Sequence, residues 1–80
     1  MTVKDVVASR FLSLCEQRGL KANALANISG VTPSTVYSLF DNRRRDVSII
    51  TIKKLCDGLD MTLGEFFSSP DFDSLEQEIK

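Results

Sequence analysis

The apolar residues of this chain recur at the three- and four-residue intervals that place side chains on one face of a helix. The first such run predicts a helix over residues 3–18, with an apolar stripe formed by Val7, Phe11, Leu14 and Cys15. Thr2 suits the N-cap of this helix, and Asp5 lies in its favourable first turn. Gly19 suits its C-terminal end, because glycine readily adopts the left-handed conformation.

Two short helices are predicted next. The second helix begins at Lys21 or Ala22, runs to Ser29 and is stopped by Gly30, and its apolar residues are Leu25, Ala26 and Ile28. The third helix covers residues 33–40, because Thr32 is a good N-cap and proline fits the first helical position. Its inward face is formed by Val36, Leu39 and Phe40.

The third helix is expected to end at Asp41 and Asn42, with Asn42 in the left-handed conformation. A charged loop follows, and Ser48 then caps a fourth helix. The apolar stripe of that helix is formed by Ile52, Leu55, Cys56 and Leu59. This helix ends within residues 58–60.

Thr62 and Glu65 have capping-box spacing and open a short fifth helix over residues 63–67. The segment Ser68-Ser69-Pro70 interrupts it, and a last turn capped by Asp71 or Asp73 follows or frays. No strand signal is found. The sequence therefore predicts a compact, all-α, five-helix domain.

The second and third helices, separated by a three-residue turn, form a helix-turn-helix arrangement. Such a pair needs a small residue where the helices cross and a glycine in the turn, and it needs apolar residues that bind the two helices together. Six residues meet these requirements in register: Leu25, Ala26, Gly30, Val31, Val36 and Leu39.

The segment "LKANALANISGVTPSTVYSLFDNRRRDVSIITIKKLCDGLDMTLGEFF" resembles the lambda-repressor-like, or Xre-type, helix-turn-helix domain, and the resemblance covers Val3 to Phe67. It implies a bacterial or phage transcription regulator that binds pseudo-palindromic DNA as a dimer, with the third helix in the major groove. The family often begins its second helix with a glutamine that bonds a phosphate and braces the third helix. Ala22 stands there in this chain, and Lys21 or Asn23 is the substitute.

The resemblance and the helix geometry assign candidate DNA contacts. The residues expected at base edges are Pro33, Ser34, Tyr37 and Ser38. Those expected on the DNA backbone are Lys21, Asn23, Thr32, Thr35, Asn42, Arg43, Arg44 and Arg45. The alternative is that these side chains form helix caps, a solvated helix face and a solvated loop.

The net charge of −1 hides an uneven distribution. Residues 1–64 carry nine Lys or Arg and six Asp or Glu, whereas residues 65–80 carry one Lys and five acids. A basic body suits a polyanion such as double-stranded DNA. We therefore expect a DNA-binding domain over residues 1–69 and an acidic, partly ordered tail over residues 70–80.

Several function classes lack support in the sequence. It has no histidine and only two cysteines, Cys15 and Cys56, which we interpret as buried thiols or as a redox pair. No metal, cofactor or small-molecule substrate is expected, and no constellation suggests an enzyme. There is neither a signal peptide nor an apolar run of the roughly 20 residues that a membrane span needs, so we expect a cytoplasmic protein.

Met61, Phe66, Phe67 and Phe72 supply more apolar surface than a lone five-helix domain needs; some of it is core, and the rest is a candidate homodimer patch. The family resemblance implies that the interface lies at the fifth helix and the tail. The function that fits best is a sequence-specific DNA-binding transcriptional regulator that acts as a repressor. The alternative is a protein-interaction module of the same fold, such as an antitoxin or an adaptor whose acidic tail binds a basic partner.

Overall fold

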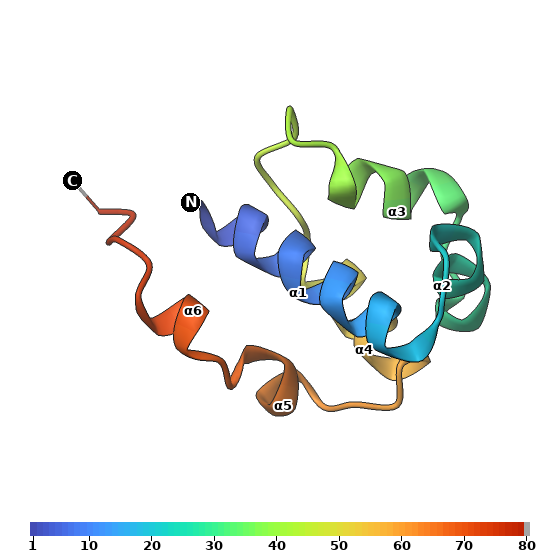
Figure 1. Ribbon diagram of the computed structural model, residues 1–80. Coiled ribbons are helices and arrows are strands. Elements are labelled where there is room, and N and C mark those ends of the chain that lie inside the picture. Colours follow the sequence, from blue (N-terminus) through green and yellow to red (C-terminus); the bar gives the residue numbers. More distant parts are fainter. Residues whose placement is uncertain (80) are drawn as a thin grey trace.

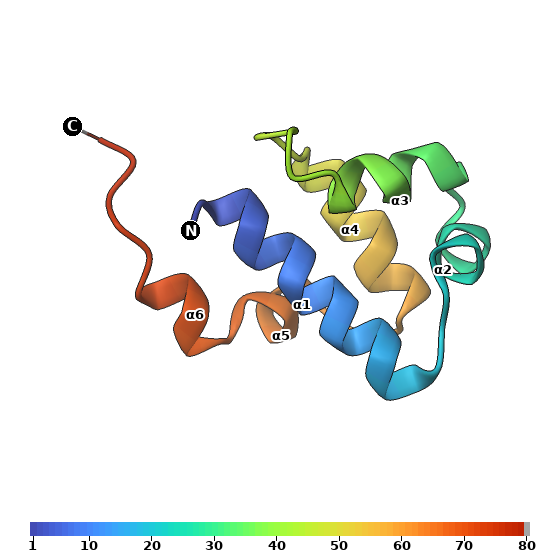
Figure 2. The ribbon, with the colours of Figure 1, turned by 45° about the horizontal axis from the view of Figure 1, so that its top comes forward.

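The computed structural model describes residues 1–79 and contains only helices and connecting loops in that range (Figure 1). The helices are α1 (Val3–Arg18), α2 (Ala22–Ser29), α3 (Pro33–Phe40), α4 (Ile49–Gly58), α5 (Leu63–Phe67) and α6 (Pro70–Asp73). The all-α fold class is confirmed, and α6 adds one turn to the five expected helices. In Figure 2, α1 crosses the middle of the molecule, with α3 and α4 on one side and α5 and α6 on the other.

The starts of α1 and α5 follow the local signals in the sequence. Thr2 and Asp5 form a capping box, in which Asp5 N donates to Thr2 Oγ1 over 3.2 Å and Thr2 N donates to the Asp5 carboxylate over 2.9 Å. Thr62 and Glu65 make the same reciprocal pair at α5. Gly19 ends α1 with a φ of 65°, as expected for a residue in the left-handed region.

The predicted left-handed residue after α3 is wrong. Asp41, in an extended conformation, follows the helix, and among the non-glycine residues of the range 1–79 only Asp60 has a positive φ, of 56°. The Asp41 carbonyl accepts hydrogen bonds from Lys4 Nζ at 2.6 Å and from Arg44 N at 3.0 Å. The chain therefore leaves α3 in an extended conformation, with the Asp41 carbonyl held by Lys4 of α1 and by the Arg44 N–H.

The cap of the last helix also differs from the expectation. Ser69 is the N-cap of α6, and its hydroxyl accepts from Asp71 N over 3.4 Å, so neither Asp71 nor Asp73 has this role. Pro70 begins the helix instead of only interrupting the chain, because a proline is well accommodated in a first helical turn.

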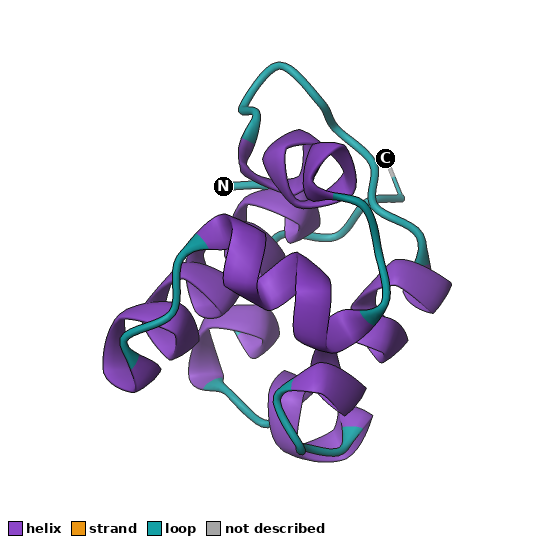
Figure 3. Cartoon of the chain, turned by 90° about the vertical axis from the view of Figure 1, so that its right-hand side faces the viewer, coloured by secondary structure: helices purple, strands orange, loops and turns teal. Residues whose placement is uncertain are grey.

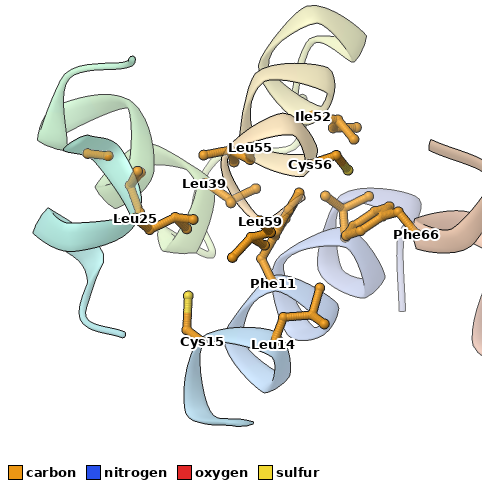
Figure 4. Close-up of a cluster of buried hydrophobic side chains, with 13 residues drawn as sticks. Phe11, Leu14, Cys15, Leu25, Leu39, Ile52, Leu55, Cys56, Leu59 and Phe66 are labelled. Atoms are coloured by element: carbon orange, nitrogen blue, oxygen red, sulfur yellow. The ribbon is translucent and has the colours of Figure 1, made fainter. Parts of the chain in front are cut away.

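The core is one cluster of buried apolar side chains drawn from α1 through α5 (Figure 4). The predicted stripes of α1 and α4 all belong to it, and the rings of Phe11 and Phe66 stack with centroids 4.3 Å apart. Cys15 and Cys56 are buried free thiols, and burial raises the pKa of both. Ile28 of α2 is 49% exposed and lies outside the core.

The aromatic residues near the C-terminus pack against the core, and part of their apolar surface remains exposed. Phe66 is fully buried, and Met61, Phe67 and Phe72 are partly buried against the cluster. The chain folds back at α6 and brings the Phe72 ring to centroid distances of 5.8 Å from Phe66 and 4.9 Å from Phe67. This extra layer was not apparent from the five-helix pattern.

Three cations of α1 donate hydrogen bonds to backbone carbonyls at the C-terminal ends of other helices. Lys4, only 3% exposed, donates to Asp41 at the end of α3, and Arg18 donates to Leu59 at the end of α4. Arg10 donates to two carbonyls in the last turn of α5, one of them at 3.0 Å. Helix C-terminal carbonyls lack intrahelical partners and carry partial negative charge, so these cations both satisfy and neutralise them.

The α2 and α4 helices approach each other most closely at Ser29 and Gly58. A Cβ atom added to Gly58 would lie 2.2 Å from Ser29 Oγ and 3.0 Å from Ser29 Cα. The Ser29 hydroxyl oxygen is buried and, within the described part of the chain, has no hydrogen-bond partner. The two small residues therefore set how closely the helix-turn-helix pair packs on α4.

We expect Gly58→Ala to lower the free energy of unfolding by about 1–3 kcal/mol, because the new methyl group overpacks this contact. Urea denaturation monitored by circular dichroism measures the change. Gly64→Ala is the matched control, since a Cβ there meets only Thr62 Oγ1 at 3.8 Å, and it should be neutral or stabilising. Adding Ser29→Ala to Gly58→Ala should restore part of the stability; no recovery would contradict the assigned contact.

Candidate nucleic-acid interface

The α2 and α3 helices form a rigid pair with one outward face. Gly30 has a φ of 68° in the turn, and Val31 N donates to Ala26 O over 3.1 Å. Four side chains are buried between the pair and the core: Leu25, Ala26, Val36 and Leu39. Figure 3 shows the described residues from the side, where they form only helices and the loops that connect them. The packing confirms the predicted helix-turn-helix arrangement, and it leaves the opposite face of α3 to solvent.

The outward side of α3 begins with a cluster of hydroxyl groups. Thr32 Oγ1 lies 3.0 Å from Ser34 Oγ and 3.1 Å from Thr35 Oγ1, so the Thr32 hydroxyl is hydrogen bonded to both of the others. Thr32 occupies the N-cap position, as predicted, but its side chain makes no hydrogen bond to the helix backbone. Pro33 and Ser34 are exposed, whereas Thr35 and Ser38 are half-buried.

Tyr37 lies farther along the same helix and is 56% exposed. Its hydroxyl donates a hydrogen bond of 3.2 Å to Asn23 Oδ1 in the first turn of α2. This contact links the exposed faces of the two helices. It also brings together a residue predicted at base edges and a residue predicted on the DNA backbone.

The arginine loop, residues 43–45, follows α3 and projects at the top of Figure 1. Arg43 pairs with Asp41 through two side-chain bonds, each 3.0 Å long, and its backbone N–H donates to the same carboxylate over 3.0 Å. These donors lower the pKa of Asp41 to about 2. Arg44 and Arg45 are exposed beside this pair.

A recess of about 240 Å³ separates α3 from the N-terminus of α4. It is lined by Thr35, Ser38, Leu39, Arg44, Asp46, Val47, Ser48 and Thr51. Four of these residues contribute hydroxyl groups and one contributes a guanidinium. The recess therefore offers hydroxyl groups, one guanidinium and the carboxylate of Asp46 next to the outward face of α3.

Three of the exposed cations of residues 1–64 lie in the arginine loop that follows α3. Lys4, Arg10 and Arg18 donate hydrogen bonds to helix ends, as described above. The sequence did not predict these intramolecular contacts. The other cations of residues 1–64 are exposed and lie on α4, in the arginine loop and just before α2, and they are Lys21, Arg43, Arg44, Arg45, Lys53 and Lys54. The Lys53 ammonium pairs with Asp57 one turn along α4.

The structure gathers most of the predicted contact residues on the outward side of α2, α3 and the arginine loop. Asn42 is exposed in that loop, and Lys21 is exposed immediately before α2. The role of Lys4 was missed, although its position was informative. Lys4 lies three residues before Val7 and thus extends the apolar stripe of α1.

Comparison with known proteins identifies the family. A family model for the Cro/C1-type HTH DNA-binding domain matches residues 10–71, and the chain belongs to this family of helix-turn-helix DNA-binding domains. The chain is also similar to the crystal structure of the prophage Lp1 protein 11, at 29% sequence identity and a TM-score of 0.83. That match covers 94% of this chain and 99% of the prophage protein. No match was found among functionally curated proteins.

Two further features bear on the function. Within residues 1–79, none of the helices combines the length and the apolar character that crossing a bilayer requires. The same residues bring no three His, Cys, Asp or Glu side chains together in a way that could hold a metal ion.

The Asp41–Arg43 pair predicts a pH dependence of the arginine loop. The pKa of Asp41 lies below its ordinary value of 3.8, so the pair contributes fully above about pH 4 and is lost as the pH falls through about 2. NMR titration of the Asp41 carboxyl carbon should give a midpoint of about 2, with Arg43 signals changing in parallel. A midpoint near 3.8 would contradict the pairing. Asp41→Asn should remove the transition in the Arg43 signals.

Proposed function

We propose that the protein is a sequence-specific DNA-binding transcriptional regulator that acts as a repressor. In this proposal α3 enters the major groove and the arginine loop binds the DNA backbone, and the protein catalyses no reaction on the DNA. The observation that carries the proposal is the outward, hydroxyl-bearing face of α3, held by α2 in a chain of the Cro/C1-type family. A repressor of this kind acts by occupying DNA in the cytoplasm.

We assign base recognition chiefly to the N-terminal part of α3. Helix-turn-helix proteins contact base edges with the first residues of this helix. Pro33 and Ser34 are exposed there, and Ser38 lies one turn farther along. A hydroxyl both donates and accepts, so Ser34 is suited to a base edge, and the bonds among Thr32, Ser34 and Thr35 limit the directions in which it points.

We assign the phosphate contacts to the loop and to the start of α2. The guanidinium of Arg43 is paired with the Asp41 carboxylate, so Arg44 and Arg45 are the main cations of the loop for phosphate binding. Lys21, Asn42 and the hydroxyls of Thr32 and Thr35 are placed where they can add weaker contacts. Such contacts position the protein on the duplex without reading its sequence.

We further propose that the protein binds DNA as a homodimer, because one eight-residue helix reaches few base pairs. The α5 helix and the tail are the proposed interface. Phe67 and Phe72 remain partly exposed there, and Ile79 of the tail is exposed.

In vitro selection of duplexes from random DNA tests the proposed function. The wild-type chain should enrich a pseudo-palindromic sequence whose half-sites are centred about 10–10.5 base pairs apart. Failure to enrich any sequence would contradict sequence-specific recognition and favour the interaction-module alternative. Repeating the selection with Ser34→Ala should change the preferred bases at one position of each half-site, and an unchanged sequence would remove Ser34 from base recognition.

We expect Arg44→Ala combined with Arg45→Ala to weaken binding to selected and random duplexes alike. For every phosphate that the variant no longer neutralises, the slope of log affinity against log salt concentration should become shallower by about 0.9. A salt-titrated gel shift measures both quantities. Lys53→Ala combined with Lys54→Ala removes the same charge from α4 and should change the slope less. Equal slopes for wild type and the arginine variant would exclude the loop from backbone binding.

A further inference from the structure

The hydrogen bond between Tyr37 and Asn23 joins two exposed side chains that lie 14 residues apart in the sequence. The donor is on α3 and the acceptor is on α2. A neutral hydrogen bond between exposed groups adds little to stability, because water replaces either partner when the bond breaks. Its main physical effect is therefore on the orientation of the two side chains.

The orientation of Asn23 decides what it can bind. A carboxamide has one acceptor oxygen and one nitrogen with two donor hydrogens. The oxygen of Asn23 faces the Tyr37 hydroxyl at 3.2 Å, so the nitrogen end faces away from Tyr37 and carries the donors. A tyrosine ring has only two side-chain torsions, which makes it a well-defined support for this arrangement.

We infer that Tyr37 is a positioning residue for DNA binding: its hydroxyl holds the Asn23 amide so that the amide nitrogen donates to a phosphate. This inference rests on the proposed DNA-binding function. The Tyr37 hydroxyl, predicted from the sequence to act at base edges, here acts through Asn23. Its contribution is to affinity for any duplex and not to the choice of bases.

The chemistry of the surroundings fits an anionic partner for the Asn23 amide. Asn23 lies in the first turn of α2, where backbone N–H groups have no intrahelical acceptor, and the N-cap residue Lys21 makes no side-chain cap. The first turn of α2 contains no acidic residue. The amide donors, the free N–H groups and the lysine therefore face a phosphate without a competing carboxylate from this turn.

The test compares Tyr37→Phe, Asn23→Ala and the double variant in gel shifts on the selected duplex and on a random duplex. Tyr37→Phe removes only the hydroxyl, and each single variant should weaken binding about 3- to 10-fold on both duplexes. The double variant should bind DNA no more weakly than Asn23→Ala alone, because both changes remove the same phosphate contact. Asn27→Ala, an exposed asparagine on the same helix, is the matched control and should leave affinity unchanged.

Single methylphosphonate substitutions along the selected duplex test the phosphate contact directly. If Tyr37 and Asn23 only stabilised the fold, the loss of affinity at each substituted phosphate would be the same in the variants as in the wild type. At one phosphate in each half-site the uncharged substitution should weaken binding of the wild type but not of Tyr37→Phe or Asn23→Ala. Additive effects in the double variant, or a Tyr37→Phe protein that binds random DNA normally but selects different bases, would overturn the inference. Absence of DNA binding by the wild type would overturn the proposed function as well, so the two failures are distinguishable.

Discussion

The structure depends on hydrogen bonds from the cations of α1 to the ends of its neighbours. Lys4, Arg10 and Arg18 donate to carbonyls at the ends of α3, α5 and α4, respectively. A small domain buries only a modest apolar core, so the arrangement of its short helices cannot rest on that core alone. Placing one cation at each of three helix ends adds a side-chain donor to the carbonyls there, and it links all three helices to α1.

Asp41 connects this scaffold to α3 and the arginine loop. Its backbone carbonyl accepts from Lys4 and from the Arg44 N–H, while its carboxylate accepts from Arg43. One residue therefore joins α1, the end of α3 and the arginine loop. In the proposed complex, this junction relates the groups that contact phosphates to the helix that contacts bases, so both engage one duplex in a fixed register.

The sequence predicted features determined by neighbouring residues and missed those that depend on the packing of distant segments. The Thr2 N-cap, the capping box of Thr62 and Glu65 and the left-handed Gly30 follow from local backbone chemistry, and the structure confirms all three. At the extended exit from α3, the Asp41 carbonyl accepts from Lys4, which is 37 residues away in the sequence and which local signals do not bring to this site. The bond between Asn23 and Tyr37 likewise depends on the crossing of α2 and α3, which periodicity alone does not specify.

The tight contact between Ser29 and Gly58 also constrains how this lineage can change. A larger side chain at either position would push α2 away from α4 and carry α3 with it, so substitutions at the two sites are not independent. A side chain larger than serine at position 29 would require a compensating shift of the α4 backbone. Among relatives that keep this interhelical spacing, the two positions should therefore covary in volume: a larger side chain at position 58 should occur with a smaller one at position 29, and the reverse.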